Sequence, residues 1–369
     1  MKIKDVTCSI VEAPMQNTWR GGNFLFDKGR AAIVQVFTDE GINGIGEAIV
    51  RLGGGPVKSI VEEILKPCIV GKDPMNIEGL WKKMFYCMGL RGHSRGYFLE
   101  AMSGVDIALW DVAGKTLEVP LYRLMMGCGR EEIPVYASSI FFNTPEKMAE
   151  EACALKEKGY RSMKIKIGQG LEKDTECLEA IRKSVGPGIK LMVDANGVYN
   201  RTDAIYVGKM LEDLDVAWFE EPLRADDLDG YKLLSEKLDL PLAAGEAEFT
   251  VWGIRPIIEN GVRIIQPNVS RAGGITESRR IASFAGALHL PYAPHTGVSS
   301  GVCMAASLHL AASAENFMIY EHMVENNPLA YSLFTTPFAH MKEGKIPVPN
   351  GPGLGITMNM DAFEKFRVN

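Results

Sequence analysis

The alternation of apolar and polar positions changes twice along the chain. The period of β-strands is found in three early runs, at residues 3–11, 30–38 and 43–49. A Gly- and Asn-rich stretch at 17–24 separates the first two runs and predicts a loop of the kind that covers binding sites. From about residue 56 to residue 126 the apolar positions recur at helical spacing, most clearly over 101–115. The first third of the chain therefore predicts an α+β unit.

Beyond Pro134, short apolar runs alternate with longer amphipathic stretches. The expected strands are residues 135–139, 162–167, 190–193, 217–219, 242–244, 264–266, 292–293 and 317–320. Strands that are mostly separated by helix-length segments predict parallel βα units. Eight such units in about 190 residues favour a (β/α)8 barrel over a doubly wound sheet, and no dinucleotide fingerprint supports the sheet. After Glu321 the sequence becomes irregular and rich in Pro and Gly, which suits a segment that folds back onto the N-terminal part.

Charge and cysteine usage exclude several classes of partner. Lys and Arg number 40 and Asp and Glu 46, so the formal net charge is −6. Nucleic acids and anionic membranes attract basic surfaces, so neither is expected as a partner. The seven Cys form no Cys-x-x-Cys pair, which is typical of reduced thiols. No signal peptide and no run of about 20 apolar residues is found, and we expect a cytoplasmic protein.

Polar residues end seven of the predicted strands, at intervals of 22 to 28 residues. They are Lys166, Asp194, Glu220, Glu246, Asn268, His295 and Glu321. In a (β/α)8 barrel the carboxyl ends of the strands meet at one face, where active sites lie. The regular spacing therefore predicts that these side chains converge on one site.

Asp194, Glu220 and Glu246 come from three consecutive strands. Three clustered carboxylates repel one another unless a cation lies among them or their pKa values rise. An all-oxygen set suits Mg²⁺, with Mn²⁺ as second choice. Zinc is disfavoured because no His or Cys joins the three. The sequence predicts a Mg²⁺ site.

Lys164 and Lys166 lie two residues apart on a predicted strand, so their side chains point to the same face. Neighbouring ammonium groups weaken each other's hold on a proton, which favours one of them as a general base. His295 ends the seventh strand on the side that faces Lys166, and it is a candidate for a second acid or base.

These strand ends resemble those of the enolase superfamily, and specifically its mandelate racemase-like members, the mandelate racemase/muconate lactonizing enzyme family. The matching segments are residues 101–115, 163–168, 193–196, 218–222, 244–246, 267–274 and 294–295. The resemblance covers nearly the whole chain. It implies an α/β fold class, with an α+β capping domain over residues 1–130, completed by residues 340–369, and a modified (β/α)7β barrel of the TIM type over residues 131–339. It also implies a homo-oligomer.

The same resemblance assigns the metal ligands. Asp194, Glu220 and Glu246 would hold Mg²⁺. Glu221, the second Glu of the Glu-Glu pair, would then point to the opposite face of its strand. A small-molecule carboxylate would bind next to the metal.

Further roles are implied by resemblance for the basic and polar residues. Lys166 would be the base, while Lys164 would tune it and touch the substrate carboxylate. Asn196 would lie beside the metal ligands, and Glu321 would hydrogen-bond the substrate. Arg20, in the stretch 17–24, would recognise a polyol chain.

Asn268 departs from the family pattern. Members of this subgroup pair the His with an Asp on the sixth strand, and the muconate-lactonising branch carries a Lys there. An Asp stabilises a positive imidazole, whereas an Asn only orients it. We therefore expect His295 to be a weaker base, and Lys166 to carry the proton abstraction. Asn268 is assigned to the substrate-binding surroundings.

These roles imply abstraction of the proton α to a carboxylate, through an enediolate stabilised by Mg²⁺. The first expectation is dehydration of a sugar acid, an aldonate or aldarate, to a 2-keto-3-deoxy acid. The alternatives are a cycloisomerase that opens an aldarolactone by β-elimination, and then a racemase or epimerase. A catalytically dead binding barrel is the alternative from another class, although all three metal ligands and Lys166 are present.

Overall fold

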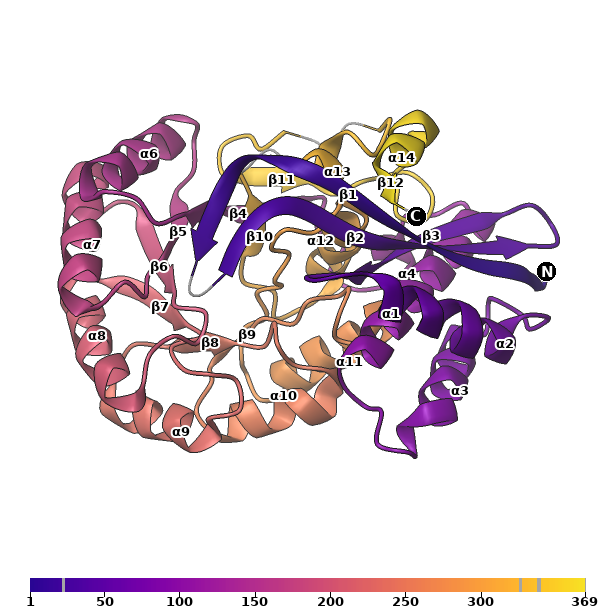
Figure 1. The fold of residues 1–369 in the computed structure, drawn as a ribbon, viewed down its shortest axis with the longest axis horizontal. Coiled ribbons are helices and arrows are strands. Elements are labelled where there is room, and N and C mark those ends of the chain that lie inside the picture. Colours follow the sequence, from indigo (N-terminus) through magenta and orange to yellow (C-terminus); the bar gives the residue numbers. More distant parts are fainter. Residues whose placement is uncertain (22–23, 325–326, 337–339, 369) are drawn as a thin grey trace.

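A computed structural model describes residues 1–21, 24–324, 327–336 and 340–368, without the side chains of residues 16–21, 24 and 26. The chain forms a parallel barrel with a separate antiparallel sheet and helices beside it (Figure 1). Among the helices in these ranges, none is long and apolar enough to cross a membrane. The predicted α/β fold class is confirmed.

The antiparallel sheet has the strand order β12-β1-β2-β3. Its strands are β1 (Ile3–Gly21), β2 (Phe24–Thr38), β3 (Asn43–Ile49) and β12 (Arg367–Val368). β12 pairs with β1, so the C-terminal end of the chain extends the sheet built by the N-terminal residues.

The loop predicted at residues 17–24 is wrong for residues 17–21 and 24, which belong to β1 and β2, while residues 22 and 23 lie outside the described part of the chain. Trp19 pairs with Phe26 and Gly21 with Phe24, after an irregularity in the register between Pro14 and Trp19. The aromatic residues of this stretch favour extended backbone and outweigh the Gly and Asn signals. The resulting long hairpin arches over the barrel (Figure 1).

Helices follow the three strands. They are α1 (Gly55–Ser59), the π-helical turn η1 (Ile60–Leu65), α2 (Lys66–Ile69), α3 (Ile77–Gly89), α4 (Tyr97–Thr116) and α5 (Leu121–Leu124). α4 is buried at every position from Phe98 to Gly114. It packs closely on β3, because a Cβ placed on Gly46 would lie 1.9 Å from the carbonyl oxygen of Gly104.

The barrel strands follow the order β10-β4-β5-β6-β7-β8-β9 and are parallel. They are β4 (Glu132–Ile140), β5 (Ser162–Lys166), β6 (Lys190–Asp194), β7 (Val216–Glu220), β8 (Leu242–Ala244), β9 (Ile264–Ile265) and β10 (Tyr320–Met323). The strand expected at 292–293 is reduced to bridges, in which Tyr292 joins Ile265 on one side and Phe317 on the other. These bridges close the barrel between β9 and β10.

Helices connect and surround the strands (Figure 1). They are α6 (Pro145–Glu157), α7 (Leu171–Val185), α8 (Arg201–Asp213), α9 (Leu228–Lys237), α10 (Thr250–Glu259), α11 (Gly274–Ala287) and α12 (Gly301–Ser313). The remaining elements are α13 (Pro328–Tyr331), β11 (Lys345–Pro347), which pairs with β4, and α14 (Met360–Phe366).

Buried carboxylates attach the N-terminal elements to the barrel. Glu47 on β3 accepts hydrogen bonds from the backbone N–H groups of Ser300 and Cys303, at 3.1 and 2.9 Å, and from the Ser300 hydroxyl at 2.6 Å. It thereby caps the first turn of α12, where backbone N–H groups lack partners within the helix. Asp106 on α4 accepts in the same way from the backbone N–H and hydroxyl of Thr276 on α11, at 2.9 and 2.6 Å.

Candidate active site

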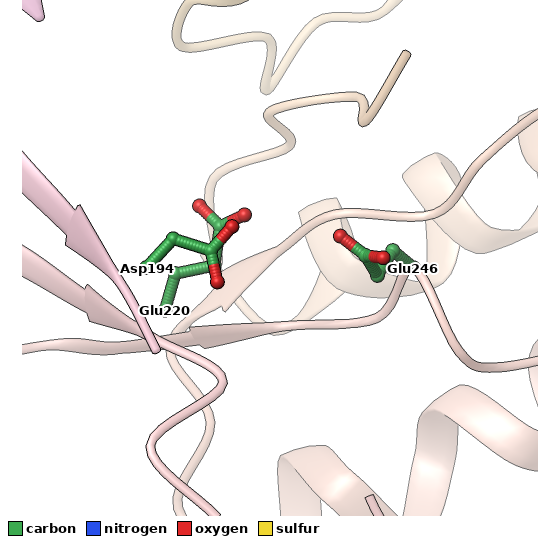
Figure 2. Close-up of side chains that lie close together, drawn as sticks. All are labelled: Asp194, Glu220 and Glu246. Carbon is green, nitrogen blue, oxygen red and sulfur yellow. The ribbon is translucent and has the colours of Figure 1, made fainter. Parts of the chain in front are cut away.

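The ends of three adjacent strands lie in one row. Lys166 pairs in register with Asp194, and Asp194 with Glu220. Glu246 follows β8 by two residues. Figure 2 shows the carboxylates of Asp194 and Glu220 together, with that of Glu246 beyond them at the next strand end. One carboxylate oxygen of each residue lies within 4.8 Å of those of the other two.

A cavity of about 600 Å³ lies over this row. Of the residues predicted from the sequence, five line it, and they are Lys166, Asn196, Glu246, His295 and Glu321. The N-terminal elements contribute Leu25, Arg30, Arg51 and Leu52 to the same lining. The sheet and the barrel therefore form the cavity together.

Glu220 is a buried carboxylate with three hydrogen-bond donors. Lys164 Nζ donates to Oε1 at 2.6 Å, while Trp218 Nε1 and Gln266 Nε2 donate to Oε2 at 3.1 and 2.8 Å. Burial raises the pKa of Glu220 to about 7, against the opposing effect of the Lys164 charge. Additional positive charge at this position would favour the ionised form.

Lys164 lies beneath the cluster, with only 1% of its side chain exposed. Its Nζ is 2.6 Å from Glu220 Oε1, 2.8 Å from Glu321 Oε1 and 3.5 Å from Asp194 Oδ2. Burial lowers the pKa of Lys164, but Glu220 and Glu321 outweigh this effect and the pKa lies well above its ordinary value. Lys164 is thus a fixed cation that holds carboxylates in place, and it does not line the cavity.

Lys166 is the more accessible of the two lysines, with 14% of its side chain exposed. Its Nζ donates to Asp194 Oδ2 at 2.5 Å and to Asn196 Oδ1 at 2.9 Å. Two acceptors therefore orient an amino group that reaches the cavity.

Glu321 is fixed by four donors. Ser138 Oγ and Lys164 Nζ contact Oε1 at 2.7 and 2.8 Å, and the backbone N–H groups of Thr296 and Gly297 donate to Oε2 at 2.6 and 3.1 Å. Burial opposes ionisation, but the charge and hydrogen bond of Lys164 and the backbone N–H of Thr296 outweigh it and keep the pKa of Glu321 far below its usual range. Glu321 therefore connects Lys164 to the loop that carries His295.

His295 lies at the other end of the carboxylate row. Its Nε2 is 2.9 Å from Glu246 Oε2, and its Nδ1 is 3.0 Å from Asn268 Nδ2. Burial by itself would raise the pKa of Glu246, and the hydrogen bond from His295 and the charges of Lys166 and Arg51 oppose this effect. Asn268 is fully buried and does not line the cavity, so its side chain contacts the histidine and not the cavity space.

Three charged residues in the lining, Glu221, Arg51 and Arg271, have no role in the sequence-based assignment of the site. Glu221, expected on the opposite face of its strand, has a φ of 39°, and this left-handed conformation brings it into the lining. Arg51 donates to the carbonyl of Gly297 at 3.1 Å, and Arg271 Nε is 3.2 Å from Glu100 Oε1. The Gly-rich stretch after Arg51 indicated only a turn. The predicted substrate contact of Arg20 lies outside the described side chains.

The three carboxylates fit a hard divalent cation. They offer only oxygen atoms, they come from rigid strand ends, and their spacing lets one ion touch all three. Glu221 and Glu321 add two further carboxylates to the site, so Lys164 and Lys166 offset only part of its negative charge. A divalent cation would offset more of it. The site therefore suits Mg²⁺.

Two family models match the chain, "Enolase C-terminal domain-like" over residues 147–362 and "Mandelate racemase / muconate lactonizing enzyme, N-terminal domain" over residues 23–127. An arabinonate dehydratase of Saccharolobus solfataricus is 35% identical, over 90% of this chain and 89% of its own length. A D-galactarolactone cycloisomerase of Agrobacterium fabrum is 31% identical, over 100% and 99%. The crystal structure of a racemase from Streptomyces coelicolor A3(2) with bound magnesium has a TM-score of 0.91 and 26% identity, and the match covers 99% of this chain and 100% of that one. The chain therefore belongs to the enolase superfamily, with an N-terminal domain of the mandelate racemase/muconate lactonizing enzyme type.

Proposed function

We propose that this chain is an enzyme that removes the proton α to the carboxylate of an acid sugar and then eliminates the oxygen substituent at the β-carbon. The placement of two proton-carrying side chains around one carboxylate cluster supports this proposal. Lys166 contacts Asp194 at one end of the row, His295 contacts Glu246 at the other, and both line the cavity. The relatives are named for reactions of a sugar acid and of a sugar-acid lactone, which supports a small carboxylate as substrate.

Asp194, Glu220 and Glu246 would hold Mg²⁺, in agreement with the magnesium named for the Streptomyces coelicolor structure. When bound, a divalent cation supplies positive charge to a substrate carboxylate and stabilises the negative charge that develops as the α-proton leaves. The buried ammonium group of Lys164 contributes fixed positive charge on the inner side of the same cluster.

Lys166 takes the α-proton at Nζ. Asp194 and Asn196 fix the position of that nitrogen, which lowers the entropic cost of reaching a reactive geometry. The Nε2 atom of His295 donates a hydrogen bond to the β-oxygen as this oxygen leaves. Glu321 holds the loop of His295 through the backbone of Thr296 and Gly297.

Two leaving groups are compatible with this arrangement. Dehydration of an aldonate or aldarate releases the β-hydroxyl as water and gives a 2-keto-3-deoxy acid, the class of the arabinonate dehydratase. Ring opening of an aldarolactone releases the ring oxygen, the class of the galactarolactone cycloisomerase. The contact between Asn268 and His295 favours the second of these.

The test is proton nuclear magnetic resonance in deuterated buffer. The protein, with Mg²⁺ or Mn²⁺, is incubated with aldonates, aldarates and aldarolactones. Elimination gives a new ketone, whereas a racemase or epimerase leaves the substrate skeleton intact and exchanges its α-proton for deuterium. Loss of the signal changes in Lys166→Ala is the expected control. A panel with neither new ketone nor exchange would overturn the proposal in favour of a binding barrel.

A further inference from the structure

The carboxamide of Asn268 has one orientation. Its Oδ1 accepts the backbone N–H of Ser270 at 2.9 Å, and the Cys303 Sγ lies 3.9 Å from the same oxygen. Rotating the amide would place its NH₂ group against the Ser270 N–H. The Nδ2 atom therefore faces His295 Nδ1, 3.0 Å away.

This orientation determines where the imidazole carries its proton. An amide nitrogen only donates hydrogen bonds, so His295 Nδ1 accepts and the ring proton resides on Nε2. An Asp at position 268 would reverse this pattern, since a carboxylate accepts from Nδ1–H and leaves Nε2 free as a base.

A neutral imidazole in this state is a hydrogen-bond donor. Release of its Nε2 proton would leave an imidazolate, and protonation of Nδ1 would bring that N–H against the Asn268 amide. His295 therefore polarises an oxygen and neither removes nor fully supplies a proton, a role that neutral histidines fill elsewhere. A leaving hydroxyl needs a full proton, whereas a leaving carboxylate needs only a hydrogen bond.

We propose that Asn268 is a positioning residue that fixes His295 as a hydrogen-bond donor, and that the site acts on acid-sugar lactones whose β-oxygen departs as a carboxylate. This inference rests on the proposed elimination. Lys166 takes the α-proton, and the C–H electron pair forms a double bond between the α- and β-carbons. The bond from the β-carbon to the ring oxygen breaks, and its electron pair makes that oxygen part of a free carboxylate. The enol then takes a proton at the β-carbon and loses its hydroxyl proton, so the keto acid is an isomer of the lactone.

The proton position is measurable without substrate. In protein labelled with ¹⁵N-histidine, His295 is assigned by its absence from His295→Gln. We expect a protonated Nε2 and an unprotonated Nδ1 in the wild type, and a protonated Nδ1 in Asn268→Asp. The exposed helix-capping residue Asn200 offers a matched control, because Asn200→Asp should leave the His295 signals unchanged. A wild-type Nδ1–H would overturn the inference whatever the protein catalyses.

Kinetics test the substrate class. We expect kcat/KM for an aldarolactone to exceed that for the open aldarate of the same configuration by at least about 100-fold, the lower end of what a general acid contributes. Asn268→Asp should narrow this ratio and introduce α-proton exchange in the opposite α-epimer. If the open acid were dehydrated as fast as the lactone is opened, the inference would be overturned and the proposed elimination would remain intact. Absence of both a new ketone and α-proton exchange would overturn both.

Discussion

Asp106→Asn isolates the pH dependence of one contact between α4 and the barrel. Asp106 is fully buried against Thr276, and burial raises its pKa from 3.8 to about 7. Between these two values the folded protein holds a proton at Asp106 that the unfolded chain has released. The free energy of unfolding therefore falls as pH rises through this window, by about 1.4 kcal/mol per pH unit for this group. The loss is complete above about pH 7.

Asparagine has nearly the same shape as the aspartic acid side chain, and it does not titrate. Between pH 5 and pH 7 the free energy of unfolding of Asp106→Asn should therefore rise by about 2 kcal/mol relative to the wild type. Urea unfolding at pH 5, 6, 7 and 8, followed by circular dichroism, measures this difference. The exposed Asp361 provides the control Asp361→Asn, which should follow the wild type. Parallel pH curves for the wild type and Asp106→Asn would refute the reasoning.

Further predictions concern the site itself. Lys166→Ala should lower kcat by about 1,000-fold or more and keep metal binding, and a near wild-type rate would exclude Lys166 as the base. Mg²⁺ at about 100 times its dissociation constant should add about 2.7 kcal/mol to the free energy of unfolding, measured by thermal unfolding with and without chelator. Glu246→Ala should remove both this gain and the turnover, and a retained Mg²⁺ shift would exclude Glu246 as a ligand. Arg51→Gln should raise the KM of a doubly charged substrate by about tenfold, which corresponds to one hydrogen bond to a charged group. The control is Arg224→Gln at the rim of the cavity, where Arg224 pairs with Asp226, and its KM should not change. Equal increases in KM for the two variants would exclude a specific contact between Arg51 and the substrate.

The barrel and the positions of its strand-end residues could be predicted because each follows from local periodicity. Lys166, Asp194 and Glu220 end neighbouring strands, and parallel pairing brings residues at equal depth together. The position of Arg51 in the cavity lining could not be predicted from local periodicity. It depends on how the N-terminal sheet packs against a barrel loop more than 240 residues further along the chain. Glu221 was misplaced since strand alternation stops where its backbone turns left-handed.

The orientation of Asn268 belongs to the same category. The sequence indicates that an Asp is replaced, but the direction of the amide dipole depends on the Ser270 N–H two residues on. The position of a backbone N–H group cannot be predicted from the pattern of side chains. Local sequence therefore predicts which residues meet, and their hydrogen-bond roles need the three-dimensional arrangement.

The carboxylate that β3 supplies to the first turn of α12 limits how this enzyme could be re-engineered. Exchanging the N-terminal sheet for that of another family member, in order to change selectivity, would also exchange the partner of Ser300 and Cys303. The helix that begins there follows directly on the loop of His295. In a chimera without an acidic residue at position 47, the first turn of α12 would lose its cap. His295 would then be held less firmly, although it lies outside the exchanged segment.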